Sequence, residues 1–246
     1  MPETSAPAEA PTAHKNLFAR IMGVLMAPRS TYAGVAARPR ALGALAVVLL
    51  IMTCGSVVFF STEVGRQALL DQQVRTMESF GIKLPAEAYQ RLEERMSQPS
   101  TPYLTAVGQI VFLPVVMLAI AGIAMAIFTA ALGGDATFKQ VFSIVAHSGV
   151  IVAVQQLFVL PLDYARESLS SPTNLDVFLP FLDEATFVAR LLGSIDLFII
   201  WSMVNLAIGL GVLYKRRTGP IAAGLLGVYV AIGLIIAAVK TALSGA

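Results

Sequence analysis

Five long runs of apolar residues constrain the fold of this chain more than any other feature. The runs cover about residues 41–61, 104–132, 138–161, 191–214 and 221–243. A helix needs roughly 20 mostly apolar residues to cross about 30 Å of hydrocarbon, and each run meets that length. The runs lack the period-two alternation of transmembrane β-strands. The sequence therefore predicts an all-α, polytopic membrane protein with five transmembrane helices.

The composition also favours a bilayer over water as the solvent. Apolar residues make up 57% of the chain and charged residues 13%, whereas soluble domains carry about 45–50% and about 25%. No basic stripe is interleaved with aromatic residues, so we expect no nucleic-acid partner. Cys54 is the only cysteine, which excludes an intrachain disulfide and a cysteine-rich metal site.

Residues 15–40, before the first span, are predicted to form an interfacial amphipathic helix. Leu17, Ile21 and Leu25 recur every fourth residue and make one apolar stripe. Pro28 ends or kinks this helix. The basic residues available to face anionic lipid headgroups are Lys15, Arg20 and Arg29. A helix of this kind also suits a partner protein, and that alternative stays open.

Two further segments lie outside the spans. Residues 1–14 are rich in Pro, Ala, Ser and Thr and lack the pattern of a secretory signal, so we expect a disordered tail that is retained. Residues 62–103 are predicted to form a helical outer loop with short helices at 63–79 and 85–96, broken at Gly81. Their mixed charge is typical of a solvated face.

Two short turns predict antiparallel hairpins and an orientation. In the turn at 133–135, Asp135 can cap the next helix, and Pro220 suits the start of the last span. Basic residues in short loops mark the cytoplasmic side. The basic cluster that decides the orientation is Lys215, Arg216 and Arg217. With five crossings, the N-terminus is then cytoplasmic and the C-terminus lies outside.

Small residues recur at every fourth position in the second and fifth spans, and we expect each series to form a tight helix–helix seam. Each seam lies either within one molecule or between two copies in a homo-oligomer. The two series are Gly122, Ala126, Ala130, Gly134 and Gly219, Ala223, Gly227, Ala231.

Polar residues inside the spans are the default place to look for function. From helical rise, four of them lie toward the outer side and form a candidate pocket centred on Asp196, and two lie near mid-membrane and are placed to pair. A carrier site is one interpretation. The other is an Asp196–Lys240 ion pair, or a solvated Asp196, with one interhelical hydrogen bond. The six residues are Asp196, Gln155, Gln156, Lys240, His147 and Asn205.

Signatures of catalysis are absent from the sequence. His14 and His147 are the only histidines, so no HExxH motif exists, and neither GxSxG nor a phosphate-binding glycine loop occurs. The Gly-Gly-Asp at 133–135 weakly matches an intramembrane aspartyl protease motif, but no neighbouring span carries a paired aspartate. We therefore expect no enzyme, no cofactor and no metal site.

Three segments together resemble the Yip family, the Ypt/Rab-interacting membrane proteins, and especially its short prokaryotic members. They are FARIMGVLMAPRSTYAGVAARP at 18–39, LGGDATFKQVFSIVAHSGVIVAVQQLF at 132–158 and LGSIDLFIIWSMVNLAIGLGVLYKRRTG at 192–219. The resemblance implies a five-helix membrane domain with a cytosolic N-terminus. Eukaryotic members are associated with small GTPases, vesicle traffic and membrane shaping, and carry longer cytosolic regions than this chain. The Ala-rich composition and compact loops look bacterial, which implies the cytoplasmic (inner) membrane.

Two functional hypotheses follow. The first is a non-catalytic membrane protein that organises lipid or partner proteins, with anionic headgroups and a membrane or peripheral protein as partners. The alternative is a transporter or permease for a small solute, with its path lined by the polar pocket around Asp196. An Asp196→Asn change separates them, because it should abolish transport but cost a scaffold only stability.

Overall fold

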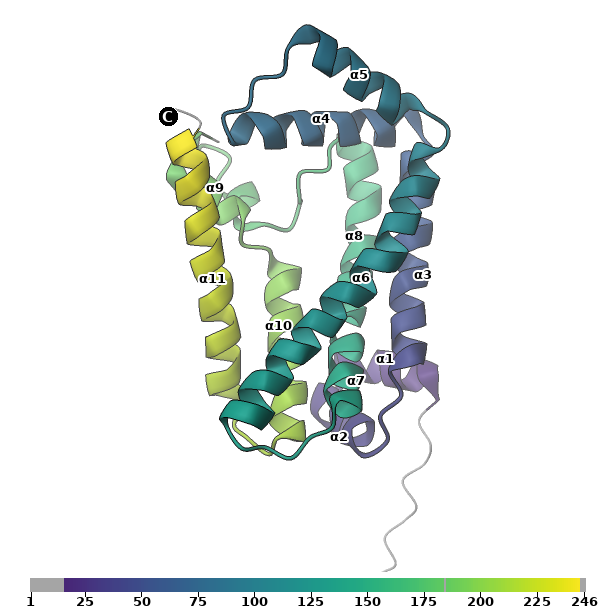
Figure 1. Cartoon of the computed structure of the whole chain (residues 1–246), viewed down its shortest axis with the longest axis vertical. Helices are drawn as coiled ribbons and strands as arrows, with labels where there is room; N and C mark the ends of the chain where they lie inside the picture. The colour runs from purple at the N-terminus through teal and green to yellow at the C-terminus, as the bar shows by residue number, and fades with distance from the viewer. Residues whose placement is uncertain (1–15, 184, 244–246) are drawn as a thin grey trace, which may run out of the picture.

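The computed structural model describes residues 16–183 and 185–243, which are mostly helical (Figure 1). The described residues contain no strand, and one isolated antiparallel bridge joins Asn174 to Asp196. The predicted all-α class is therefore confirmed. The elements are α1 (Leu17–Met26), α2 (Pro28–Ala37), α3 (Ala41–Phe60), α4 (Glu63–Ser79), α5 (Ala86–Ser97), α6 (Thr101–Met125), the π-helix η1 (Ala126–Ala131), α7 (Phe138–Ser148), α8 (Val150–Arg166), the 3₁₀-helix η2 (Leu175–Phe178), α9 (Phe187–Gly193), α10 (Leu197–Leu213) and α11 (Thr218–Leu243).

The helices form a bundle with two distinct ends. The passages α3, α6 with η1, α7 with α8, and α11 each run between these ends, whereas α10 starts part-way along the bundle and runs to its lower end in the view of Figure 1. The α1–α2 hairpin lies at one end, which we call the α1–α2 end, and α4, α5 and α9 lie at the other, the α4–α5 end. Successive passages alternate in direction, as the two predicted hairpin turns require.

Four passages are long and apolar enough to cross a bilayer, which agrees with the predicted polytopic membrane protein. They cover Ala41–Phe60, Thr101–Ala131, Phe138–Arg166 and Thr218–Leu243, with mean hydropathies between 1.8 and 2.8. The remaining passage, α10, is the fourth along the chain; it is apolar but has only 17 residues.

The second passage is longer than a bilayer is thick. Thr101–Ala131 has 31 residues, which is about 46 Å of helix against about 30 Å of hydrocarbon. Tilting accommodates the excess length, and Figure 1 shows α6 crossing the bundle diagonally. Pro114 lies inside this helix, which ends in the π-helical turn η1.

The third passage is the centre of the bundle. Of its most apolar stretch, 56% is buried inside the protein, whereas the other three long passages have only 17–22% buried. Helix α7 packs against α2, α3, α6 and α10, and Val141, Ile144 and Ile151 are fully buried. The core therefore lies around α7, toward the α1–α2 end.

The segment predicted to lie on the membrane surface is a helical hairpin that is partly built into the core. Helix α1 ends at Met26, and Pro28 starts α2 as its first residue, which fits the expected break. Val24 and Tyr32 are fully buried and belong to the main core cluster. The hairpin is therefore docked on the bundle rather than laid loosely beside it.

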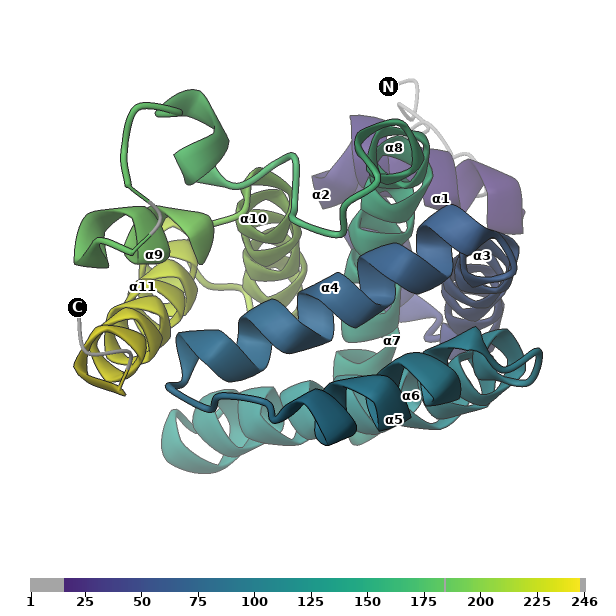
Figure 2. The same cartoon turned by 90° about the horizontal axis from the view of Figure 1, so that it is seen from above.

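Helices α4 and α5 lie across the opposite end of the bundle (Figure 2). Helix α4 spans Glu63–Ser79 as predicted, and α5 starts at Ala86, one residue later than expected. The turn into α4 is tight because the Thr62 hydroxyl accepts the Gly65 N–H and donates to the Phe59 carbonyl. A Cβ on Gly65 would lie 2.0 Å from that carbonyl oxygen, so glycine is required.

Candidate functional site

A buried polar cluster ties the α1–α2 hairpin to the bundle. The Tyr32 hydroxyl donates to Asn205 Oδ1 at 2.5 Å and lies 3.0 Å from Ser148 Oγ. Asn205 Nδ2 donates to the Val24 carbonyl at 3.0 Å. No more than 3% of any of these three side chains is exposed. One network of hydrogen bonds therefore joins α1, α2, α7 and α10.

His147 lies beside this cluster, but the predicted pairing of His147 with Asn205 is wrong. Its Nδ1 is 2.7 Å from the Ser143 carbonyl oxygen, one turn earlier in the same helix. His147 is fully buried, and its Nε2 has no hydrogen-bond partner in the structure. Asn205 is instead satisfied by Tyr32 and Val24.

Asp196 is the N-cap of α10 rather than a residue within a span. Its Oδ1 accepts the N–H groups of Phe198 at 2.8 Å and Ile199 at 3.3 Å. Its Oδ2 accepts three side-chain donors, from Gln155 at 3.0 Å, Ser171 at 2.7 Å and Thr173 at 2.6 Å. A carboxylate with five donors holds the α10 start, α8 and the 171–173 loop together.

The backbone around Asp196 is fixed as firmly as its side chain. The Asp196 N–H donates to the Tyr229 hydroxyl of α11 at 2.9 Å, and that hydroxyl donates to the Ser194 carbonyl at 2.7 Å. Leu197 N–H donates to the Thr173 carbonyl at 3.0 Å. The roles of Thr173 and Tyr229 could not be predicted from the sequence, because neither a pairing between loops nor a single hydroxyl on an apolar helix produces a recognisable residue spacing.

The predicted fourth span therefore starts too early. Residues 191–193 belong to α9, a separate helix, and α10 begins only at Leu197. An aspartate directly before an apolar run is an N-cap signal. That signal could have placed the helix start correctly.

The structure brings Gln155 to Asp196 but gives the other two members of the predicted pocket different neighbours. Lys240 Nζ lies 5.3 Å from the centroid of the Phe80 ring, a cation–π contact with the segment after α4. Gln156 lies against α3, where its Nε2 is 3.3 Å from the position of a Cβ on Gly55. The expected Asp196–Lys240 ion pair is therefore replaced by the capping network.

The basic residues divide into exposed and half-buried groups. Arg29, Lys215, Arg216 and Arg217 are exposed at the α1–α2 end. Arg20 is partly buried against the bundle, and burial together with the neighbouring Arg40 guanidinium lowers its pKa. Arg20 was predicted to face outward toward the lipid headgroups, but in the structure its side chain is partly buried against the bundle. Lys15 and the predicted tail at 1–14 lie outside the described residues.

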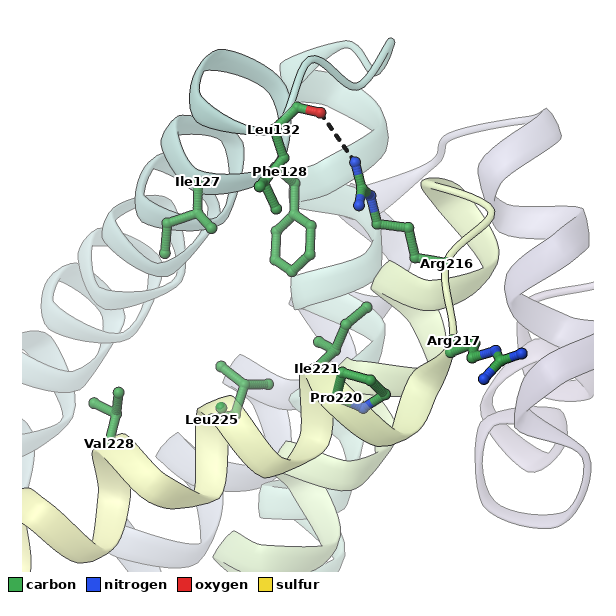
Figure 3. A pocket seen from close by; sticks show the side chains of 10 residues that line it. Ile127, Phe128, Leu132, Arg216, Arg217, Pro220, Ile221, Leu225 and Val228 are labelled. Atoms are coloured by element: carbon green, nitrogen blue, oxygen red, sulfur yellow. Dashed lines mark hydrogen bonds between the residues drawn. The ribbon is translucent and has the colours of Figure 1, made fainter.

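An apolar cleft opens between η1 and the first turns of α11, at the α1–α2 end (Figure 3). Its volume is about 510 Å³. Arg216 lies at its rim, where Nη2 donates to the Leu132 carbonyl at 2.9 Å. The wall formed by η1 is fixed to α10, because Phe128 stacks on Tyr214 with ring centroids 5.1 Å apart.

Comparison with known proteins decides the family. A family model described as the Yip1 domain matches residues 22–239, from within α1 to near the end of α11. The chain belongs to this family. Neither the curated proteins nor the solved structures gave a match. The Yip1 match and the four apolar passages identify an integral membrane protein.

The Yip1 domain is not known as an enzymatic family. Among residues 16–183 and 185–243, no group of three or more His, Cys, Asp or Glu side chains could hold a metal ion. Of the six candidate polar residues of this Yip1 domain, Asp196 and Gln155 are engaged in capping α10, and Asn205 is engaged in docking the hairpin.

The predicted small-residue seams do not form inside this Yip1 domain. Of the eight residues, only Gly134 packs closely, because a Cβ there would lie 2.6 Å from Tyr214 Cδ1. The buried small residues lie on other faces, at Ala121 and Ala124 of α6 and Gly233 and Ala237 of α11. The residues exposed on the outside of the bundle are Gly122, Ala126, Ala130, Gly219, Ala223, Gly227 and Ala231.

Substituting leucine at the two ends of the first series tests this assignment. We expect Gly134→Leu to lower the free energy of unfolding by about 1–3 kcal/mol, because its side chain overpacks against Tyr214. Gly122→Leu should change it by less than about 0.5 kcal/mol, because a Cβ there meets nothing within 4 Å. Thermal unfolding in detergent measures both. Equal destabilisation by the two variants contradicts the assignment.

Proposed function

We propose that this Yip1-domain protein is a non-catalytic membrane protein that organises lipids, and partner proteins with them, at one face of the bilayer. Helix α1 is its contact surface. The observation that carries the proposal is the two-sided character of α1. Phe18 and Met26 are 72% and 78% exposed, whereas Val24 on the other side is fully buried against the bundle.

The orientation of α1 suits insertion into one leaflet. The helix lies across the end of the bundle rather than along it (Figures 1 and 2). An amphipathic helix in the plane of the membrane buries its apolar face roughly 5–10 Å into the boundary between headgroups and acyl chains. The Tyr32–Asn205 network fixes the hairpin, so α1 would hold a constant position in that boundary.

The charges support a cytoplasmic position for this end. The short α10–α11 loop carries Lys215, Arg216 and Arg217, and basic residues in short loops mark the cytoplasmic side. The C-terminal end of α11 lies at the α4–α5 end. We therefore propose a cytoplasmic α1–α2 end and a C-terminus outside, in the cytoplasmic membrane of a bacterium.

The contacts of the polar groups favour this role over that of a solute carrier. A binding site needs polar groups that can exchange their partners for a ligand. The Asp196 carboxylate already accepts five donors, and Asn205 bonds on both sides of its amide. Releasing these groups to a ligand would break the hydrogen bonds that cap α10 and those that dock the α1–α2 hairpin.

The proposal predicts that α1 influences the shape of membranes that contain the protein. At equal, high protein density, liposomes with the wild type should be smaller than liposomes with Phe18→Asp/Met26→Asp, because two carboxylates keep α1 out of the leaflet. The median diameter from electron cryomicroscopy measures the effect.

Phe181→Asp is the control, because Phe181 is also 78% exposed but lies in the segment between η2 and α9, outside the α1–α2 hairpin. It should leave the diameter at the wild-type value. The thermal midpoint of each variant in detergent excludes misfolding as the cause. Equal diameters for the wild type and the double variant would refute the role of α1.

A further inference from the structure

We propose that the cleft between η1 and the first turns of α11 binds one anionic phospholipid, with an acyl chain along its apolar walls and the phosphate at Arg216. The inference rests on the proposed function in one respect, which is that the α1–α2 end lies at a headgroup layer. It adds a defined site for a single lipid molecule, on elements distinct from α1.

The walls of the cleft match a hydrocarbon chain. One wall is formed by η1 and its end and the other by α11, and Figure 3 shows their apolar side chains on facing sides. A volume of about 510 Å³ accommodates a chain rather than a headgroup alone. The wall residues are Ile127, Phe128, Leu132, Ile221, Leu225 and Val228.

The depth of the cleft matches one leaflet. Helix α11 begins at Thr218, and Val228 is the deepest lining residue along it. The ten helical steps from Thr218 to Val228 rise about 15 Å, which is half of the roughly 30 Å hydrocarbon core. A lipid whose phosphate is level with the start of α11 would therefore have its chain beside the whole cleft.

Charge complementarity selects an anionic headgroup. The bond from Arg216 Nη2 to the Leu132 carbonyl holds the guanidinium at the mouth of the cleft, and it uses one of the five N–H donors of arginine. Lys215 and Arg217 are exposed beside it, although Figure 3 shows Arg217 turned away from the cleft. The first turn of α11 carries no acidic residue, and the N-terminus of a helix also favours an anion.

Gly224 leaves space that the protein itself does not fill. It lines the cleft, and a Cβ built on it meets nothing within 4 Å. Leucine at this position can therefore be accommodated without displacing neighbours while it occupies the place of the acyl chain. Gly227, on the same helix and equally open, is not among the lining residues and provides the matched control.

Native mass spectrometry of the full chain in detergent, titrated with phosphatidylglycerol or phosphatidylcholine, tests the site. We expect one phosphatidylglycerol to bind the wild type more tightly than phosphatidylcholine. Arg216→Gln should weaken phosphatidylglycerol binding about fivefold, the effect of removing one nearby charge. Gly224→Leu should weaken it about tenfold by excluding the chain. Gly227→Leu should retain wild-type binding. So should Lys139→Gln, which removes an exposed cation near the start of α7 that does not line the cleft.

Four results would overturn the inference. Equal binding of the two lipids would show that charge does not select the headgroup. Unchanged binding by Gly224→Leu would show that the acyl chain does not lie in the cleft. Displacement of the lipid by inorganic phosphate alone would show a simple anion site, and conversion of a dimer to a monomer by Gly224→Leu would show a second copy there. Retained phosphatidylglycerol binding in Phe18→Asp/Met26→Asp separates this site from the α1 contact, so that either proposal can fail alone.

Discussion

Replacement of Tyr32 by alanine is expected to lower the free energy of unfolding by about 3–5 kcal/mol, the usual cost of removing a large aromatic ring from a core. Tyr32 is fully buried and is the largest such side chain of the described residues. Its loss leaves a cavity between α2, α7 and α10, and also leaves Asn205 Oδ1 without its donor. Chemical unfolding in detergent measures the loss.

Tyr32→Phe separates packing from hydrogen bonding at this position. It keeps the ring and removes only the hydroxyl, so the expected loss is about 1 kcal/mol. Hydrogen exchange should show faster exchange in α1 and α2 for Tyr32→Ala, with α3 and α11 little changed. An alanine variant as stable as the phenylalanine variant would contradict the claim that the hairpin is docked through Tyr32.

Asp196→Ala is expected to lower the free energy of unfolding by about 2–4 kcal/mol. Loss of an N-cap typically costs about 0.5–2 kcal/mol, and buried donors left without an acceptor add to this cost. The side-chain donors concerned are those of Gln155, Ser171 and Thr173. Hydrogen exchange should locate the effect in the 171–178 loop and the first turn of α10.

Asp196→Asn tests how the carboxylate is used. The asparagine Oδ1 can still accept the Phe198 N–H. Its NH₂ group, however, is a donor, and it would replace the oxygen that accepts the three side-chain donors. We expect an intermediate loss of stability, with the loop destabilised more than the helix start. Wild-type stability in both Asp196 variants would show that the network does not hold the fold, and would return Asp196 to the candidates for solute binding.

The sequence predicted the helices well wherever hydropathy and turn residues decide them. The first span begins at Ala41 in both prediction and structure, and α4 covers the predicted 63–79. Pro28 and Gly81 mark chain breaks as expected. These features depend on local chemistry, which a single sequence contains.

The fourth span shows why hydropathy alone misplaces a helix start. Leu191 and Leu192 extend the apolar run backwards, so a window of apolar residues includes them. They belong to α9, because Asp196 bonds the first N–H groups of α10 and turns the preceding chain aside. A hydropathy window treats Asp196 as an intrusion into the span, although it is the residue that starts the helix.

The tertiary partners could not be read from spacing. A series of small residues four apart defines one face of a helix, but not what that face meets. In α11 the face with Gly219, Ala223 and Gly227 lies outside, whereas Gly233 packs against Ser194. The partnership of Tyr32 with Asn205 spans 173 residues and has no local signature.

We conclude that the polar residues of the membrane domain hold the fold together and do not bind a solute. A structure in lipid nanodiscs, determined by electron cryomicroscopy with a bound antibody fragment, tests this conclusion directly. We expect Asp196 to cap α10 with Gln155, Ser171 and Thr173 around it, and no continuous water density between Asp196 and Asn205. A water-filled path from Asp196 to His147, or ordered ligand density at Asp196, would rule out this structural role and support a carrier.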